Sequence, residues 1–573
     1  MSNTPRPQFL PTPCPPDSPI PPLIFTSTSP IGDQKIEEAI PVIQCPADFP
    51  LSIFEEAAML LVNHPEYNST LILRSELIAT YTSPPFPPST PQIKGYEPTK
   101  AYYRKLLPRR PTRDASLEQL CTLYTKSPDP HELEDMKTQG SEDDPLYTTP
   151  TLLVLTPLPS PSTPLPYYHP QVSQISFHLH PPSSPTLLIS LLPLPPTSQN
   201  DQDPTNPSSR LHRTSLSLLQ TLHRYLHGTL TSYKKRTAHD LLIPRDEYQD
   251  LYGVMRERHK GLVEEWREVT DPLKHVFEDI GIATYLMLLW KDTFPPEGEE
   301  QEEKLEEEPW KKWGRPPGGF LDLGCGNALL THILLSEGYK GYGIDVRARK
   351  SWDGYPESTR ERLVVGGVDP LALVGSCEDA SRSCEDTPSP SSSDQNQINT
   401  ILNTPQMFLI ANHADELTPW VPVLSTLMDS SGYISIPCCA WAFDERFTRG
   451  RGADEFFEEP SSLQTKDARE LQRPNEQSLS SFITSLSLGS EGSSSSSYSS
   501  YRIWLAGLSG WCGWVVECDN LRIPSTRNWA VVGRKKLPTP PEQTLERAKS
   551  IILQTKERGL FRVRKPEGKA GEH

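Results

Sequence analysis

The chain has 573 residues, and 62 of them are proline, about twice the usual share. Lysine and arginine number 56 against 73 aspartate and glutamate, which gives a formal net charge of −17. This length is too great for a single ordinary domain, and so much proline indicates that part of the chain lies outside packed cores. We expect two ordered domains with low-complexity segments between and within them.

Patterns along the chain exclude several classes of protein. Proline, serine or charge interrupts every apolar run well before the 18 or so residues that a membrane span needs, and the N-terminus lacks a signal-like pattern. Ten cysteines occur without a CxxC pair, which argues against a disulfide framework and a zinc ribbon. We therefore expect a cytoplasmic protein with reduced thiols, no membrane partner and no metal site.

The N-terminal half divides into a tail and a folded region. Residues 1–40 are rich in proline, serine and threonine and predict a disordered tail. Residues 41–245 predict an α+β domain, with an amphipathic helix near its start and a leucine-rich helix over 209–235. The expected strands between these helices are TPTLLVLTPL, SQISFHLH and TLLISLLPL, separated by proline-rich turns.

The C-terminal half begins with helices and continues as alternating strands and helices. From residue 318, GGFLDLGCGNALLTHILLSEGYKGYGIDVRAR has the pattern of strand, glycine-rich turn, helix and second strand, which is a βαβ unit. The expected segments, in chain order, are a helical segment at 246–296, an acidic linker at 297–311, an α/β domain at 312–537 with low-complexity insertions at 376–400 and 485–500, and a polar C-terminal helix or tail at 538–573.

The glycine-rich turn LDLGCGNA lies at a strand-to-helix junction, where backbone amides face a ligand and glycine allows close approach. Asp345 ends the second strand 19 residues after Gly326, a spacing typical of the acidic residue that binds ribose hydroxyls in doubly wound sheets. Asp322, two residues before the first glycine, would repel phosphate but suits a cationic sulfonium. The pattern favours S-adenosylmethionine over NAD; the alternative is a glycine-rich turn that binds no ligand.

This βαβ segment and several others resemble the fungal tRNA (uracil-2′-O-)-methyltransferases that act on uridine 44 of serine tRNAs. The likeness covers the chain from about residue 95 to 535 outside the low-complexity insertions. Members of that family usually carry glycine where this chain has Ala328. The further segments that carry the resemblance are NHADELTPW (412–420), IPCC (436–439), LRIPST (521–526), WREVTDPLKHVFEDIGIATYLMLLW (266–290), LLPRRPTRD (106–114) and YKKRTAHDLLIPRDEYQDLY (233–252).

The resemblance implies a class I (Rossmann-like) S-adenosylmethionine-dependent methyltransferase domain that methylates a ribose 2′-hydroxyl of serine tRNA. The N-terminal domain contains no catalytic motif, so tRNA recognition is assigned to it by default. Two other functions stay open: a methyltransferase of the same fold with a protein or small-molecule acceptor, and a tRNA-binding pseudoenzyme. The basic segments RKLLPRRPTR and YKKR favour RNA, whereas Ala328 alone supports a pseudoenzyme.

In such methyltransferases the end of the fourth strand faces the methyl group and the acceptor. Asn412 would orient cofactor or acceptor, and His413 or Asp415 would be the general base. The site residues that we predict are Asn412, His413, Asp415 and Glu416 as catalytic; Asp322, Gly324, Cys325, Gly326, Asn327, Asp345 and Asp369 as cofactor-binding; and Arg347, Arg349, Lys350, Arg522 and Arg527 as substrate-binding.

Several of these residues also have a purely structural interpretation. Asp415 and Glu416 could cap the following helix, and Asp369 before a proline could initiate a turn. The arginines could be solvated surface residues, and Cys325 a small buried residue. The helix in 266–290 is interpreted as core packing. Cys438, Cys439, Cys512 and Cys518 have irregular spacings, which favour core positions over a metal site.

Overall fold

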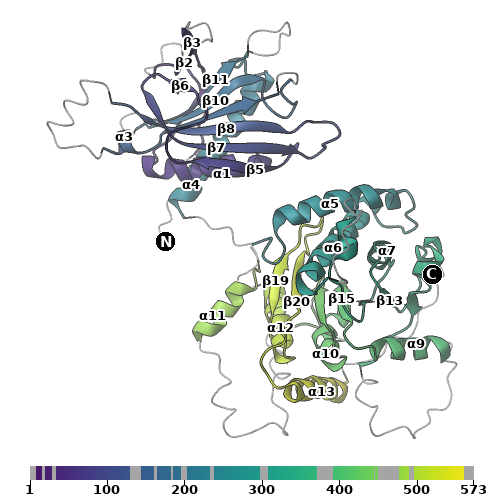
Figure 1. Cartoon of the computed structure of the whole chain (residues 1–573). Coiled ribbons are helices and arrows are strands. Elements are labelled where there is room, and N and C mark those ends of the chain that lie inside the picture. The colour runs from purple at the N-terminus through teal and green to yellow at the C-terminus, as the bar shows by residue number, and fades with distance from the viewer. Residues whose placement is uncertain are drawn as a thin grey trace. The chain divides into compact units, whose positions relative to one another are not determined.

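The computed structural model in Figure 1 describes residues 8–15, 20–28, 34–128, 144–160, 164–181, 185–194, 203–232, 238–296, 308–370, 392–443, 445–448, 476–488 and 496–559. The chain divides into two compact units, Met1–Lys234 and Lys235–His573, each with its own sheet. No helix among the described residues combines the length and the apolar character that crossing a membrane requires.

The first unit is built on one antiparallel sheet. Its described strands follow the order β1-β4-β11-β10-β9-β8-β7-β6-β2-β3, and β5 pairs with β7 beside that path. The strands are β1 (Thr12–Pro13), β2 (Ile24–Thr28), β3 (Gln34–Glu38), β4 (Ile40–Pro46), β5 (Ile72–Tyr81), β6 (Gln92–Ile93), β7 (Tyr96–Pro108), β8 (Leu117–Lys126), β9 (Leu152–Leu158), β10 (Val172–Leu179) and β11 (Thr186–Pro193). The helices are η1 (Leu51–Ile53), α1 (Phe54–Asn63), η2 (Pro65–Tyr67), α3 (Pro145–Thr148) and α4 (Arg210–Leu230).

Helices α1 and α4 contact each other and cover one face of this sheet (Figure 1). The leucines of α4 recur at helical spacing, so Leu219, Leu222 and Leu226 are buried on one side of the helix. Ser209 caps α4, because its side chain accepts a hydrogen bond from the backbone amide of His212. Sheet and helices together enclose one apolar core.

The prediction of a disordered tail over residues 1–40 is wrong for much of its described part. β1, β2 and β3 lie in that segment, and they occupy the two ends of the strand order. Proline is tolerated at the edge of a sheet, where its missing amide hydrogen removes no ladder bond, so a proline-rich segment can still pair there. The division between the units, at Lys234, also falls before the boundary expected at residue 245.

The second unit contains a seven-stranded sheet with the order β14-β13-β12-β15-β16-β20-β19 among its described strands. The first five of these are parallel, and β20 and β19 are antiparallel additions. The strands are β12 (Phe320–Leu323), β13 (Gly341–Asp345), β14 (Leu363–Val365), β15 (Phe408–Asn412), β16 (Gly432–Ile436), β19 (Glu517–Asn520) and β20 (Trp529–Gly533); β17 (Trp441–Ala442) and β18 (Glu445–Arg446) form a separate pair.

Helices cover both faces of the second sheet (Figure 1). One face packs against α5, α6 and α7, where Trp290 of α6 stacks on Phe320 of β12 and meets Phe408 of β15 edge-on. The other face packs against α9, α10, α12 and α13. The helices are α5 (Arg245–His259), η3 (Lys260–Val263), α6 (Pro272–Thr293), η4 (Pro309–Lys312), α7 (Leu329–Ser336), η5 (Trp352–Gly354), α8 (Glu357–Arg360), α9 (Ser392–Leu402), η8 (Asp415–Leu417), α10 (Trp420–Leu427), α11 (Glu476–Ser485), α12 (Ser497–Trp511) and α13 (Pro541–Glu557).

The low-complexity segments are only partly described. Of the insertion expected at 376–400, residues 376–391 lie outside the described residues, and α9 begins at Ser392. Of the insertion expected at 485–500, the last four residues belong to α12. Ser496, the residue before them, caps that helix. The acidic run at 297–307 lies outside the described residues.

Candidate active site

A cavity of about 360 Å³ lies at the carboxyl ends of the parallel strands. Strands β12, β13, β14 and β15 each contribute the loop that follows them, and α6 closes the cavity from one side. Its described lining is His275, Glu278, Asp279, Asp322, Gly324, Cys325, Gly326, Asn327, Leu330, Ile344, Asp345, Val346, Arg349, Gly366, Gly367, Val368, Asn412, His413, Ala414, Asp415, Glu416, Leu417 and Trp420. This is the edge where open parallel sheets bind their ligands.

The turn between β12 and α7 is held by Asp345 at the end of β13. One carboxylate oxygen of Asp345 accepts a hydrogen bond of 2.9 Å from the backbone amide of Gly326, and the other accepts one of 3.0 Å from the backbone amide of Arg347. Gly324 and Gly326 have φ values of 70° and 55°, which glycine adopts at little cost. Ala328 is also left-handed, at φ 61°, and is fully buried. The turn therefore keeps a glycine-like conformation at a residue with a side chain.

Carboxyl groups dominate the charge of the cavity. Burial raises the pKa of Asp322 to about 7, although Thr331 donates a 2.7 Å hydrogen bond to its carboxylate. Burial, with Glu278 and Asp322 nearby, also raises the pKa of Asp279 well above its usual value. Together with Asp345, Asp415 and Glu416, six carboxyl groups face a single arginine among the described lining residues. Such a site suits a cationic ligand and disfavours a pyrophosphate.

The loop after β15 meets α6 across the cavity. Asn412 donates a 3.4 Å hydrogen bond to Asp279, and Nε2 of His413 lies 3.2 Å from a carboxylate oxygen of Glu278. Oδ1 of Asn412 and Nδ1 of His413 are buried, and no hydrogen-bond partner for either atom is found in the described part of the chain. His413 and Asp415 have φ values of 54° and 44°, so both hold the left-handed region that non-glycine residues seldom occupy.

Glu278 is held ionised by its neighbours. Its side chain is buried, which by itself would favour the neutral acid, but hydrogen bonds with His413 and Ser525 outweigh burial and lower the pKa of Glu278. An ionised carboxylate beside Nε2 of His413 fixes the orientation of the ring. The pair thus has the geometry of a base whose orientation is set by a carboxylate.

Two family models match the chain. One, described as a TRM44-like N-terminal Bet v1-like domain, matches residues 18–236, and the other, described as a predicted AdoMet-dependent methyltransferase, matches residues 242–303 and 308–370. Fungal proteins named tRNA (uracil-O(2)-)-methyltransferase are similar over most of their length. The Neurospora crassa protein is 31% identical over 505 residues, which cover 84% of this chain and 84% of that protein. The chain belongs to this methyltransferase family.

Two further relatives bear the same name. The protein of Schizosaccharomyces pombe is 30% identical over 492 residues, covering 85% of this chain and 83% of the relative. That of Saccharomyces cerevisiae is 28% identical over 560 residues, covering 85% and 84%. No solved structure matches the chain. As a member of the family, the chain is an S-adenosylmethionine-dependent methyltransferase with a Bet v1-like first unit.

The structure brings most of the predicted cofactor and catalytic residues of this methyltransferase to the cavity. All four predicted catalytic residues line it, as do all the predicted cofactor residues except Asp369. The loop before Asp369 contributes Gly366, Gly367 and Val368 instead. Asp415 and Glu416 are not cap residues, since Ala414 caps η8 and Pro419 caps α10, but both lie in the first turn of η8, where acidic residues are favourable.

The predicted substrate residues are distributed differently. Arg349 lines the cavity, and Arg347 and Lys350 lie beside it in the same loop. Arg522 forms a bidentate ion pair with Asp240, at 2.5 and 2.6 Å, and the guanidinium of Arg527 lies 4.0 Å from the ring centre of Tyr498. These two arginines already have partners within the chain.

One basic residue that favoured an RNA partner has a structural role. Arg104 is 3% exposed and donates hydrogen bonds to Gln119 and to the backbone carbonyl of Val62, so it is not available to a phosphate. YKKR at 233–236 lies outside the described residues. The other arginines of the same N-terminal segment, Arg109, Arg110 and Arg113, are exposed.

The contribution of α6 to the site was missed by sequence reasoning, which interpreted this helix as core packing. His275, Glu278 and Asp279 line the cavity, and Asp271 caps the helix by accepting the amide of Leu273. The available signal was two adjacent acidic residues within an otherwise apolar helix, which a core position does not explain. Cys325 is half-buried in the cavity wall, and desolvation together with Asp322 and Asp345 raises its pKa well above the usual value, which favours a thiol over a reactive thiolate.

Proposed function

We propose that this methyltransferase transfers a methyl group from S-adenosylmethionine to the ribose 2′-hydroxyl of a uridine in tRNA, and that the nucleotide is uridine 44 of serine tRNA. The observation that carries the proposal is the acidic cavity with the His413–Glu278 pair on one side and the Asp345-anchored turn on the other. Relatives of similar length named tRNA (uracil-O(2)-)-methyltransferase support the substrate class. A cytoplasmic location stays a prediction.

We assign the second unit to the class I, Rossmann-like methyltransferases. The parallel strands run in the order β14-β13-β12-β15-β16, which by position in the chain is 3-2-1-4-5. This order reverses between β12 and β15, and the cavity lies at that reversal, as expected for doubly wound sheets. The strand order and the place of the cavity support the assignment independently of the glycine-rich turn.

The residues of the cavity fit S-adenosylmethionine. Asp345 would bind the ribose hydroxyls, the backbone of Gly324 and Gly326 would approach the ligand closely, and Asp322 would face its positive charge. When bound, this cofactor supplies an electrophilic methyl group on a sulfonium sulfur. The six carboxyl groups of the lining favour the net positive charge of this ligand over phosphate-bearing cofactors.

His413 is the residue best placed to accept the proton of the acceptor hydroxyl. A ribose hydroxyl is a very weak acid, so methylation of its oxygen needs a base that takes the proton as the new bond forms. The free Nδ1 of His413 can take it while Nε2 donates to Glu278. Asn412, whose Oδ1 is also without a partner in the described chain, would orient the acceptor or the cofactor.

Substrate contacts are proposed for the loop after β13 and the loop before β20. Arg347, Arg349 and Lys350 would contact the tRNA backbone near the cavity. Arg522 would contact the tRNA only if a phosphate replaced Asp240 as its ion-pair partner. Arg527 would contact the tRNA while its guanidinium stays over the ring of Tyr498. Recognition of the rest of the tRNA is assigned to the Bet v1-like unit.

The turn at Ala328, on which the pseudoenzyme alternative rested, has the backbone hydrogen bonds of a closed turn. Ala328 keeps the turn closed, because its amide donates to Cys325 at 2.8 Å and its carbonyl accepts the amide of His332 at 2.8 Å. The turn therefore has the hydrogen bonds needed to start α7 in spite of the additional methyl group.

The deciding experiment is transfer of a labelled methyl group to unmodified serine tRNA by the purified protein, with mapping of the product nucleotide. We expect label at the 2′-oxygen of uridine 44. A matched tRNA with 2′-deoxyuridine at that position should accept none. Transfer to the deoxy substrate would show that the base or another nucleotide is methylated, and cofactor binding without any transfer would contradict the proposed substrate.

A further inference from the structure

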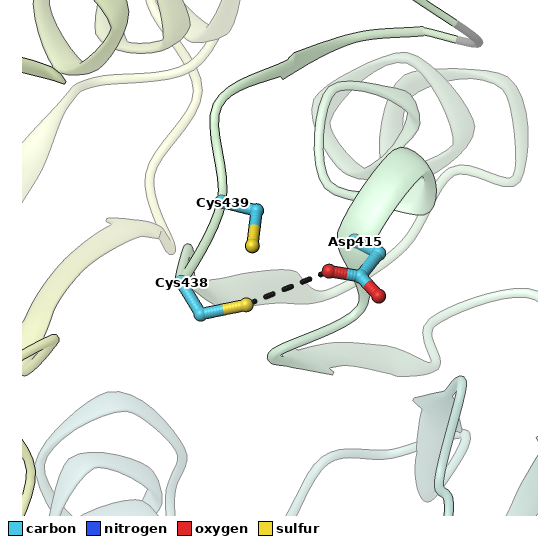
Figure 2. Close-up of side chains that lie close together, drawn as sticks. All are labelled: Asp415, Cys438 and Cys439. Atoms are coloured by element: carbon cyan, nitrogen blue, oxygen red, sulfur yellow. Dashed lines mark hydrogen bonds between the residues drawn. The ribbon is translucent and has the colours of Figure 1, made fainter. Parts of the chain in front are cut away.

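Three potential metal ligands lie close together, as Figure 2 shows, and one of them, Asp415, lines the cavity. Asp415 lies in η8, directly after β15, and Cys438 and Cys439 follow β16, the neighbouring strand. Their ligand atoms all lie within 4.8 Å of one another. In the metal-free chain the thiol of Cys438 donates a hydrogen bond to Asp415, with Sγ 3.6 Å from Oδ1 (dashed in Figure 2). Two adjacent loops at the carboxyl edge of the sheet therefore direct two sulfur atoms and one carboxylate toward a common point.

This ligand set has the chemistry of a zinc site. Thiolate and carboxylate are both zinc ligands, and in a tetrahedral site a sulfur at about 2.3 Å and an oxygen at about 2.0 Å from the metal lie about 3.5 Å apart. The separation of 3.6 Å between Cys438 and Asp415 matches that edge. Three protein ligands leave one position for water or another exogenous ligand.

The backbone at Asp415 gives separate support. Its φ of 44° is a left-handed conformation that costs a non-glycine residue on the order of 1–3 kcal/mol unless its surroundings require it. The carboxylate of this residue lies toward the two cysteines (Figure 2). By contrast, the buried Cys512 and Cys518 belong to the apolar core and to no such group among the described residues.

We propose that Asp415, Cys438 and Cys439 bind one Zn²⁺ ion. The ion joins the loop after β15 to the loop after β16, and so fixes the wall of the cavity formed by Asp415. Each cysteine exchanges its S–H bond for a sulfur–zinc bond, so binding releases two protons to the buffer and changes no oxidation state. The metal-binding proposal does not depend on the identity of the methyl acceptor.

The test is titration of the metal-free, reduced full-length protein with Co²⁺ and then with Zn²⁺. We expect one Co²⁺ per chain with a thiolate-to-cobalt charge-transfer band, which Zn²⁺ abolishes. Cys438→Ser and Cys439→Ser should each remove about half of the band and weaken zinc binding at least about tenfold. Asp415→Asn should weaken binding while keeping both thiolates. Cys14→Ser, a half-buried cysteine of the first unit, is the matched control and should change neither quantity.

A second measurement uses only the unmodified sequence, so it holds even if a variant fails to fold. Alkylation followed by peptide mapping should show that Zn²⁺ protects Cys438 and Cys439 but not Cys14. The proposal is overturned if no charge-transfer band forms, if Cys438→Ser and Cys439→Ser leave it unchanged, or if protection falls on Cys377 or Cys384 instead.

Discussion

The two sides of the cavity are built differently. Where the turn after β12 meets the end of β13, the hydrogen bonds join residues of one βαβ unit. Where α6 meets the loop after β15, the hydrogen bonds join α6 to a distant strand. Gly326 and Asp345 are 19 residues apart, but Glu278 and His413 are 135 apart. We use "cofactor side" for the turn after β12 with the end of β13, and "acceptor side" for α6 with the loops after β15 and β16. Cofactor binding here therefore depends on local backbone geometry, whereas the proposed proton transfer depends on how a separate helix packs.

Removing the charge of Glu278, on the acceptor side, should reduce activity more than any other change. Glu278→Gln keeps the shape of the side chain but removes the charge that orients the ring of His413. We expect kcat to fall about 100-fold, within the range for loss of base assistance, and the Kd of S-adenosylmethionine to change less than about threefold. Steady-state kinetics and calorimetry measure the two quantities. Glu257→Gln, on the exposed surface of α5, is the matched control.

The pair should also behave as one unit. If Glu278 acts through His413, the double variant Glu278→Gln/His413→Ala should lose little more activity than His413→Ala alone. Additive losses would mean that the two residues act independently, and would leave Glu278 without the positioning role.

The next effect tests the cofactor side. Asp345→Asn removes the negative charge of a carboxylate that accepts hydrogen bonds from the backbone amides of Gly326 and Arg347. The same carboxylate would bind the ribose hydroxyls of the cofactor. We expect cofactor affinity to fall about 10- to 100-fold, as for loss of charged hydrogen bonds.

Asp369→Asn separates the two interpretations of Asp369: a loss comparable to that of Asp345→Asn indicates a cofactor ligand, and a change below about threefold indicates a turn residue. Calorimetric titration measures both.

The third prediction concerns the pH dependence of cofactor binding. Burial raises the pKa of Asp322 to about 7, and the groups facing it are Asp279, Asp345, Cys325 and Thr331. In the free protein Asp322 is therefore mostly protonated below pH 7. Binding of a cationic ligand favours the ionised carboxylate, so below pH 7 it is coupled to loss of the proton from Asp322. Affinity for S-adenosylmethionine should rise with pH by up to about tenfold per unit and level off above about pH 7.

The stability of the cofactor-free protein should respond to Asp322 in the opposite sense. Because its folded pKa lies above its ordinary value, its contribution favours folding at low pH and is lost as pH rises through about 7. Asp322→Asn should flatten both profiles. Binding measured in two buffers of different ionisation enthalpy counts the protons, and an affinity independent of pH in the unmodified protein would contradict the assignment.

The comparison also explains what the sequence could predict. Gly324, Gly326 and Asp345 were found because turn chemistry and strand spacing are local patterns. Glu278 and Asp279 were missed because the apolar spacing of α6 is the same whether the helix only fills a core or also faces a ligand. Cys438 was judged by spacing along the chain, which cannot show that Asp415 of the neighbouring loop lies beside it.

The first unit illustrates the same limit for the fold. The segment that forms β7 was interpreted as a basic cluster, yet its buried positions alternate, and Arg104 occupies one of them between Tyr102 and Leu106. A half-buried strand is identified in a sequence by the alternation of apolar and polar residues. A charged residue at a buried position interrupts that alternation. The hydrogen bonds from Arg104 to Gln119 compensate its burial, and that partner comes from β8, a strand that was not predicted either.

The smallest effect is expected at Ala328, on the cofactor side. Its φ of 61° suits glycine, so Ala328→Gly should relieve strain, partly offset by the loss of one buried methyl group and by a more flexible unfolded chain. We expect the free energy of unfolding of the second unit to rise by about 0.5–1 kcal/mol, with cofactor affinity nearly unchanged, in denaturant titration and calorimetry. Ala328→Val, which adds a branched side chain in the same conformation, should destabilise the unit. If Ala328→Gly lowered stability instead, packing of the buried methyl group would outweigh backbone strain, and the cofactor side would depend on side-chain contacts as the acceptor side does.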